Sequence, residues 1–165
     1  MPTAGILTIS DTRAAGSRAD TTTQMMAEIL GEAGFEIAEK RLVPDELADI
    51  AAAITELAQI AELVFTSGGT GLAPRDVTPE ATLSVIDRQA PGIAEAMRAE
   101  TARIQPLSYL SRAVAGQLGT TLVINLPGNP KAVRECFDVL LPMLPHAIKT
   151  STGGGEDKHR AMHGS

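Results

Sequence analysis

Residues 63–82 read LVFTSGGTGLAPRDVTPEAT, and this stretch indicates a buried strand, a glycine-rich loop and the start of a helix. Residues 63–66 are all apolar or β-branched, which is typical of a strand buried on both faces. Ser67-Gly68-Gly69-Thr70-Gly71 contains too much glycine for regular structure. Thr78-Pro79 then predicts a helix with Thr at the N-cap and Pro at the first helical position. Strand, loop and helix in this order form the repeating unit of a parallel α/β sheet.

The same alternation extends in both directions along the chain. Apolar runs predict further strands at Ile6–Ile9, Phe35–Val43 and Thr120–Leu126. Amphipathic spacing predicts helices at Met25–Ala33, from Pro44 to Ala61, from Gly92 to about Ile104, and from Asn129 to Leu144. Strands that alternate with such helices need a sheet covered on both faces. We therefore predict a three-layer α/β/α fold with a mostly parallel central sheet.

Two boundaries have specific signals in the sequence. Gly34 follows the first predicted helix and is expected in the left-handed conformation of a helix C-cap. Pro142 and Pro145 are expected to kink or shorten the last helix, because proline lacks the N–H that a helix interior needs.

Length and composition limit the classes of protein that need to be considered. The 165 residues suit one domain, which we place at 1–150, with 151–165 as a flexible C-terminal tail. The net charge of −6 argues against nonspecific attraction to nucleic acid or to an anionic membrane. The chain lacks Trp and has three Phe and one Tyr, which leaves few side chains on which bases could stack. No apolar run is long enough for a membrane span, and the N-terminus lacks the basic region of an export signal, so we expect a cytoplasmic protein.

Cysteine and histidine add little chemistry. Cys136 is the only cysteine, which excludes an internal disulfide and a multi-cysteine zinc site, and its apolar surroundings place it in the core. It has no upstream histidine to activate it as a nucleophile. His159 and His163 have the spacing of metal ligands, but they fall in the predicted tail, where solvated side chains are the simpler interpretation.

Four polar loops follow the predicted strands. They comprise residues 10–20, 44–45, 67–76 and 127–131. Ligands of parallel α/β sheets bind beyond the carboxyl ends of the strands, so these loops are predicted to form one cleft.

The glycine-rich loop is a candidate phosphate site. Gly68, Gly69 and Gly71 permit positive φ angles and close approach, so successive N–H groups can point at an anion. The alternative is a tight turn that binds nothing. No Lys-Ser or Lys-Thr pair follows, which excludes a Walker loop, and Pro74 occupies the place of the last glycine in a dinucleotide-binding fingerprint.

Two aspartates are candidate metal ligands. Asp76 comes five residues after Gly71, and its carboxylate would repel a phosphate on the loop unless a divalent cation lay between them. The sequence therefore predicts Mg²⁺ beside Asp76. Asp45 follows the second strand and has the same ambiguity. The alternatives are a surface ion pair or a helix-entry carboxylate for Asp76, and a helix cap for Asp45. Capping and solvation also explain Asp11 and Asp20.

Residues 129–131 offer a second anion site. Asn129 and Pro130 suit a helix start, where backbone N–H groups can hold an anion, and structural capping explains the two residues equally well. Lys131 adds a cation near the positive end of that helix, which is unfavourable by ~0.3–1 kcal/mol unless an anion offsets it. Ser111-Arg112 offers a further fork-shaped phosphate contact, although a lone arginine is more often a surface residue than a site residue.

These motifs occur in one order along roughly residues 5–148. They are Ile9-Ser10-Asp11, Val43-Pro44-Asp45-Glu46, Thr66 to Gly71 with Arg75 to Thr82, Pro91-Gly92, Ser111-Arg112 and Leu126 to Lys131. In this order they resemble the MogA/MoaB family of molybdenum cofactor biosynthesis proteins.

The resemblance implies a molybdopterin adenylyltransferase, which uses Mg²⁺ and ATP to place AMP on the terminal phosphate of molybdopterin and releases pyrophosphate. It also implies a homotrimer or hexamer, with the downstream molybdenum insertase as a partner. The alternative is a noncatalytic molybdopterin-binding or scaffold protein of the same fold. The residues expected to be catalytic and to bind the metal are Asp45 and Asp76. Those expected to bind substrate or phosphate are Ser10, Asp11, Ser67, Gly68, Gly69, Thr70, Gly71, Ser111, Arg112, Pro127, Gly128, Asn129 and Lys131.

Overall fold

The computed structural model describes residues 1–154, and its centre is a six-stranded sheet in the order β2-β1-β3-β6-β5-β4. The parallel strands are β1 (Thr3–Ile9), β2 (Glu36–Val43), β3 (Leu63–Ser67) and β6 (Thr121–Leu126). The edge strands β5 (Ala115–Leu118) and β4 (Arg88–Gln89) run antiparallel to their neighbours. The predicted mostly parallel sheet is confirmed, whereas the two antiparallel strands are additions to it.

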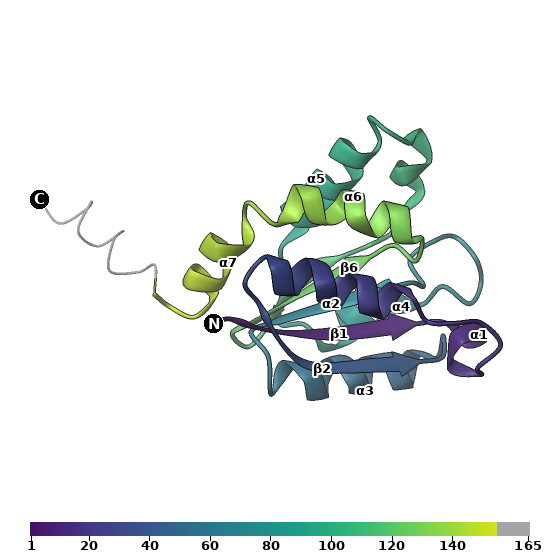
Figure 1. Cartoon of the computed structure of the whole chain (residues 1–165), viewed down its shortest axis with the longest axis horizontal. Coiled ribbons are helices and arrows are strands. Elements are labelled where there is room, and N and C mark those ends of the chain that lie inside the picture. Colours follow the sequence, from purple (N-terminus) through teal and green to yellow (C-terminus); the bar gives the residue numbers. More distant parts are fainter. Residues whose placement is uncertain (155–165) are drawn as a thin grey trace, which may run out of the picture.

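Helices cover both faces of the sheet (Figure 1). They are α1 (Asp11–Ala14), α2 (Thr22–Glu32), α3 (Leu47–Ala58), α4 (Thr78–Val85), α5 (Pro91–Thr101), the 3₁₀ helix η1 (Pro106–Leu110), α6 (Pro130–Leu140) and α7 (Leu144–Ser151). In β3, Leu63 and Phe65 pack in the core beneath α2, α5, α6 and α7, while Val64 packs in the core beneath α3 and α4. The Phe65 ring lies 5.2 Å from that of Phe137 on α6, centroid to centroid. The predicted three-layer α/β/α arrangement is thus confirmed.

The helix termini follow several local predictions. Gly34 has φ +93° after α2, as expected of a C-cap glycine. Asp20 precedes the N-cap of α2, which is Thr21, and its carboxylate accepts hydrogen bonds from the N–H and the hydroxyl of Thr23 in the first turn. The predicted long final helix ends at Leu140, before Pro142, and α7 begins separately.

Two local predictions are corrected. Thr78 is the first residue of α4 rather than its N-cap, which is Val77. Its hydroxyl donates to the carbonyl of Gly68 instead of accepting a hydrogen bond from the first turn of the helix. The loop after β1 was expected to be irregular, but it contains α1.

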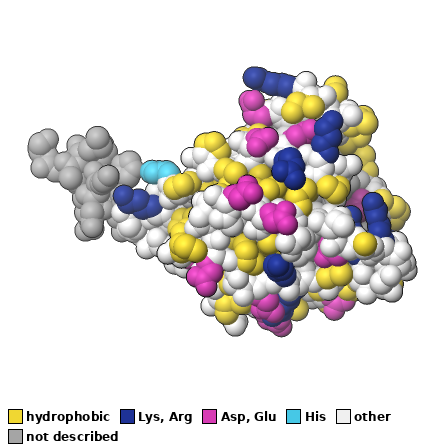
Figure 2. Space-filling model, in the orientation of Figure 1, with side chains coloured by type: hydrophobic (Ala, Val, Ile, Leu, Met, Phe, Trp, Pro, Cys, Tyr) yellow, Lys and Arg dark blue, Asp and Glu magenta, His cyan; other side chains and the backbone are white. Residues whose placement is uncertain are grey.

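Surface features agree with the composition. Acidic and basic side chains are interspersed on the face shown in Figure 2. Among residues 1–154, no helix is both long and apolar enough to cross a bilayer. Of the predicted tail, residues 155–165, with His159 and His163, lie outside the described part of the chain.

Candidate active site

The loops after the four parallel strands meet at one edge of the sheet. The N–H of Ser10, after β1, donates to Val43 at the end of β2 (3.0 Å). The N–H of Gly68, after β3, donates to Leu126 at the end of β6 (3.1 Å). The Ser67 hydroxyl donates to the carbonyl of Pro127 in the loop after β6 (2.8 Å). Four segments that are distant in the sequence therefore share one rim.

The glycine-rich loop lies closer to its neighbours than a side chain would allow. Gly68 has φ +103°, and a Cβ there would overlap the carbonyl oxygen of Ile9. Gly69 has φ +67°, and a Cβ there would overlap the hydroxyl of Thr78. Within residues 1–154, the N–H groups of Gly69, Thr70 and Gly71 donate to no protein acceptor. Three adjacent main-chain donors are thus left for a ligand.

Asp45 and Asp76 both approach this loop. Asp45 Oδ1 lies 3.1 Å from the position of a Cβ on Gly69, and Asp76 Oδ2 lies 2.8 Å from the position of a Cβ on Gly71. The two carboxylates therefore both lie against the glycine-rich loop rather than on opposite sides of the molecule. Their catalytic and metal-binding roles stay predictions.

Asp45 is fixed by a reciprocal pair of hydrogen bonds with Asp11. The N–H of Asp11 donates to Asp45 Oδ2 (2.9 Å), and the N–H of Asp45 donates to Asp11 Oδ1 (2.9 Å). The alternative that Asp45 caps α3 is wrong, because the N-cap is Glu46 and no side chain caps this helix. Asp11 also pairs with Arg75, which in turn contacts Glu46. These exposed ion pairs contribute little stability by themselves.

The environment shifts the pKa values of the two paired carboxyls, Asp11 and Asp45, in opposite directions. Partial burial raises the pKa of Asp45, and the neighbouring Asp11 and Asp76 charges raise it further, against a hydrogen bond from Asp11 that lowers it. Hydrogen bonds from the Arg75 guanidinium and from the Asp45 N–H lower the pKa of Asp11. The site thus holds Asp45 as a carboxylate whose charge is poorly compensated by the protein alone.

Asp45→Asn is expected to raise the melting temperature at pH 7. The pKa of Asp45 is higher in the folded protein than in the unfolded chain. The protonated carboxyl therefore stabilises the fold below the unfolded-state pKa, and this contribution is lost as the pH rises through the folded-state pKa. Asparagine is neutral and can still accept the Asp11 N–H. The melting temperature of Asp45→Asn should therefore exceed that of the wild type at pH 7, and the difference should vanish near pH 3, as measured by thermal denaturation across this range.

The matched control is Asp138→Asn, which removes one exposed negative charge from α6. An equal gain in this variant would assign the effect to the net charge of the protein. A gain in Asp45→Asn that did not change with pH would contradict the role given to burial.

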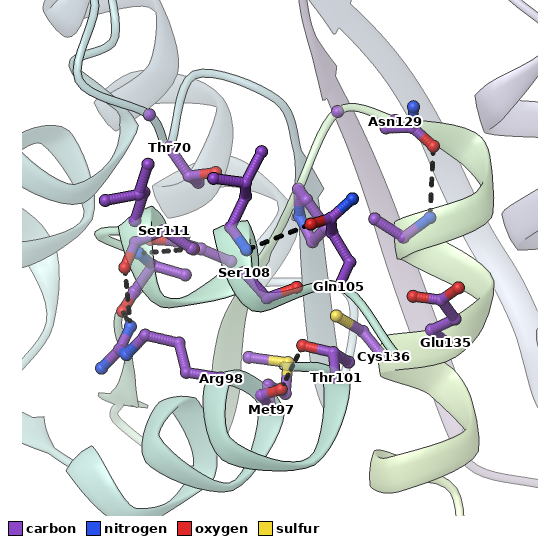
Figure 3. Close-up of a pocket in the computed structure, with 18 of the residues that line it drawn as sticks. Thr70, Met97, Arg98, Thr101, Gln105, Ser108, Ser111, Asn129, Glu135 and Cys136 are labelled. Carbon is purple, nitrogen blue, oxygen red and sulfur yellow. Dashed lines mark hydrogen bonds between the residues drawn. The ribbon is translucent and has the colours of Figure 1, made fainter. Parts of the chain in front are cut away.

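A cavity of about 570 Å³ opens beside the glycine-rich loop (Figure 3), within the size range of small-molecule sites. The sequence predicted nine of its lining residues, which are Gly69, Thr70, Gly71, Asp76, Ser111, Pro127, Gly128, Asn129 and Lys131. The other predicted residues lie outside the lining, and they are Ser10, Asp11, Asp45, Ser67, Gly68 and Arg112. Of the two candidate metal ligands, Asp76 therefore lines the cavity and Asp45 does not.

Asn129 and Lys131 form one wall at the start of α6. The side chain of Asn129 accepts hydrogen bonds from the N–H groups of Lys131 and Ala132, so the capping interpretation of Asn129 is confirmed. Within residues 1–154, Lys131 forms no ion pair. An unpaired ammonium thus remains beside the cavity.

Sequence reasoning missed the opposite wall, which α5 and η1 provide. Its residues are Ala94, Met97, Arg98, Thr101, Gln105, Leu107, Ser108 and Leu110. Thr101 from α5 and Cys136 from α6 face the same space in Figure 3. The amphipathic spacing of α5 was a usable signal for a wall, but nothing in the segment after it indicated a ligand.

Cys136 is buried as predicted, and burial raises the pKa of its thiol to about 12. A thiol of that acidity stays protonated near neutral pH and is a poor nucleophile. The cysteine therefore contributes cavity surface.

The donor set at the rim suits a cation that is shared with a ligand. Within residues 1–154, no group of three or more His, Cys, Asp or Glu side chains could hold a metal ion by itself. Mg²⁺ is commonly bound by one or two carboxylates together with substrate phosphates. Asp45 and Asp76, next to three unpaired N–H groups, fit that arrangement.

Comparisons with known proteins place the chain among molybdopterin proteins. Residues 5–146 match the family described as "Probable molybdopterin binding domain". The chain is 42% identical over 139 residues to the molybdopterin adenylyltransferase of Escherichia coli (strain K12), covering 81% of this chain and 71% of that protein. It is 39% identical over 150 residues to the molybdenum cofactor synthesis protein cinnamon of Drosophila melanogaster.

That alignment with cinnamon covers 88% of this chain, which spans about a quarter (25%) of the longer protein. Among solved structures, the molybdopterin biosynthesis enzyme MoaB of Thermus thermophilus has a TM-score of 0.87 and 48% identity. The match covers 93% of this chain and 98% of that one.

Proposed function

Because the chain belongs to the MogA/MoaB family of molybdopterin-binding domains, we propose that it is a molybdopterin adenylyltransferase. It transfers AMP from ATP to the terminal phosphate of molybdopterin and releases pyrophosphate. The observation that carries this proposal is the glycine-rich loop, whose unpaired N–H groups lie between two carboxylates and open into the cavity. The adenylyltransferase of Escherichia coli, at 42% identity, supports the same reaction.

The reaction needs positioning and charge neutralisation more than it needs a protein nucleophile. An oxygen of the molybdopterin phosphate attacks the α-phosphorus of ATP, forming the new O–P bond. The bond from that phosphorus to the bridging oxygen breaks, and pyrophosphate leaves with the electron pair. Bringing two phosphates together in the correct orientation supplies much of the rate enhancement of such transfers. The high pKa of Cys136, the cavity's only thiol, agrees with direct transfer.

The chain's own groups provide the binding sites for these phosphates. The N–H groups of residues 69–71 donate to phosphate oxygens, and Lys131, which also lines the cavity, balances negative charge there. Asp45 and Asp76 would hold Mg²⁺, which when bound supplies charge neutralisation between the phosphates. The hydrogen bond from Asp11 orients Asp45 before the substrates arrive. Residues of α5 and α6 line the cavity beside these phosphate sites.

The proposed assembly rests on the family resemblance, and the proposed location rests on the sequence pattern. We propose a cytoplasmic homotrimer or hexamer that passes its product to a molybdenum insertase. Exposed apolar side chains on η1, including Leu107 (65% exposed) and Tyr109 (64%), support self-association. Analytical ultracentrifugation checks this, and a sedimenting mass equal to that of one 17.2 kDa chain would refute it.

The direct test of function is to incubate the protein with molybdopterin, ATP and Mg²⁺. We expect adenylylated molybdopterin and pyrophosphate in equal amounts, detected by chromatography, and no product after EDTA treatment. If product is absent where a known adenylyltransferase succeeds, the enzymatic proposal fails. Calorimetry with each ligand then distinguishes the alternative, because a scaffold protein of this fold would bind molybdopterin without binding Mg·ATP.

A further inference from the structure

Arg112 lies outside the cavity lining, and its side chain reaches the segment that carries Asp76. Its backbone N–H donates to the carbonyl of Thr70 (2.8 Å). Its Nε donates to the carbonyl of Gly71 (2.8 Å), and its Nη2 donates to the carbonyl of Asp76 (2.6 Å). Nη1 forms an ion pair with Glu80 on α4. All four contacts therefore fall on residues 70–80.

The middle of this segment is also held through Arg75, which pairs with Asp11 and Glu46. Residues 72–75 are exposed, and the turn they form is closed by two hydrogen bonds. The N–H of Asp76 donates to the carbonyl of Ala73 (2.9 Å), and the N–H of Ala73 donates to Asp76 Oδ2 (3.1 Å). The two carbonyls that Arg112 holds, on Gly71 and Asp76, lie at the two ends of this turn. The guanidinium thus fixes the distance between the carbonyls of Gly71 and Asp76, and with it the position of the Asp76 carboxylate beside Gly71.

Arg112 is itself anchored from the cavity side. Arg98, on α5, donates from Nη1 to the carbonyls of Ser111 (3.3 Å) and Ala113 (2.8 Å), the residues on either side of Arg112. Figure 3 shows the Arg98 side chain directed at the segment that contains Ser111. The α5 wall, the segment around Arg112 and the turn carrying Asp76 are therefore connected by hydrogen bonds.

We propose that Arg112 is a positioning residue, which sets the place of the Asp76 carboxylate by holding both ends of the 71–76 turn. The proposal rests on the function given above, and it replaces the phosphate contact expected for Arg112 from the sequence. Only a guanidinium suits the task, because its planar fork presents donors at fixed angles to several acceptors at once. A lysine ammonium can keep the charge and the Glu80 pair but not the fixed geometry across two carbonyls.

The test compares Arg112→Lys with Glu80→Gln. The first variant keeps the charge and loses the fork, whereas the second removes the ion pair and leaves both carbonyl contacts. The amide proton of Ala73 reports the carboxylate position directly, because it is bonded to Asp76 Oδ2. Its hydrogen exchange, measured by NMR, should become about tenfold faster in Arg112→Lys and stay within about twofold in Glu80→Gln.

Two functional measurements separate positioning from direct contact. In Arg112→Lys, the Mg²⁺ concentration for half-maximal turnover should rise about tenfold, because Asp76 is displaced. Binding of ATP in EDTA, measured by calorimetry, should change less than about twofold, since a lost phosphate contact would weaken it even without metal. Glu80→Gln should resemble the wild type in both measurements.

Each other outcome has a definite meaning. Unchanged exchange at Ala73 in Arg112→Lys overturns the proposal, and so does faster exchange with an unchanged Mg²⁺ requirement, which would mark a purely structural role. Weaker metal-free ATP binding would restore the phosphate contact and also overturn it. An inactive wild type would refute the proposed function alone, and the Ala73 exchange would still decide whether Arg112 places Asp76.

Discussion

Asp76→Asn is expected to slow adenylyl transfer by about 10²- to 10³-fold while the fold survives, as when one group that stabilises transition-state charge is removed. Of the two candidate metal ligands, Asp76 lines the cavity and Asp45 does not. The Asp76 carboxylate lies beside Gly71. Asparagine has nearly the same shape and can still accept the hydrogen bond from Ala73. The variant therefore loses the negative charge and retains the local structure.

Single-turnover rates at saturating molybdopterin and Mg·ATP measure the effect on the chemical step. Thermal denaturation shows whether the fold is retained. Asp138→Asn provides the control, because it removes one carboxylate from the exposed side of α6. If Asp76→Asn turned over at the wild-type rate, Asp76 would have no part in catalysis, and the metal site at the rim would have to be abandoned.

The sequence predicted the rim of this site because the rim follows from topology. Parallel strands all present their carboxyl ends at one edge, so the loops after β1, β2, β3 and β6 had to meet there. Gly68 and Gly69 were recognisable because positive φ angles favour glycine. Local patterns of this kind need no knowledge of distant contacts.

The far wall of the cavity depends on tertiary packing. The amphipathic spacing of α5 indicates a packed helix face, but no local pattern predicts that the segment after it completes a cavity. The segment 102–110 has no regular apolar spacing, and it became a wall only because α5 packs against α6. Strand β4 has two residues, and β5 reads AGQL, with a glycine and little β-branched character. These strands form because the backbone of β5 can pair with the edge left open by β6, and β4 can then pair with β5.

The role of Arg112 was also beyond a sequence argument. An arginine after a serine in a polar loop is equally compatible with a phosphate contact and with an exposed surface position. The structure shows carbonyl acceptors at Gly71 and Asp76, which are up to 41 residues away in the sequence. Main-chain acceptors carry no side-chain signature, so their convergence on a guanidinium is visible only in three dimensions.

A series of buried hydrogen bonds connects the glycine-rich loop to α4 and β6. Asn125 on β6 donates to the hydroxyl of Thr82, which donates to the carbonyl of Thr78. The hydroxyl of Thr78 in turn donates to the carbonyl of Gly68. The side chains of Asn125, Thr82 and Thr78 are buried, and buried polar groups are costly to leave unpaired. The loop therefore has little freedom to shift if a side chain is added to it.

Gly68→Ala should consequently destabilise the protein by about 2–5 kcal/mol, as the sum of a strained φ angle and an overpacked site. The new Cβ would overlap the carbonyl of Ile9, which belongs to the central strand β1 and cannot rotate away. Relief requires the loop to lift, which would break the Thr78–Gly68 hydrogen bond and displace the N–H groups of residues 69–71. Turnover should therefore fall even at temperatures where the variant remains folded.

Gly119→Ala separates the steric effect from the backbone effect. Gly119 also has a positive φ (+61°), but a Cβ there would meet nothing within 4 Å. This variant should lose only about 1–2 kcal/mol, the cost of left-handed backbone for an L-residue, and should keep its turnover. Urea denaturation gives both free energies of unfolding. If the two variants were equally stable, the loop would have room to move, and its close seating against β1 could not be what holds its N–H groups toward a phosphate.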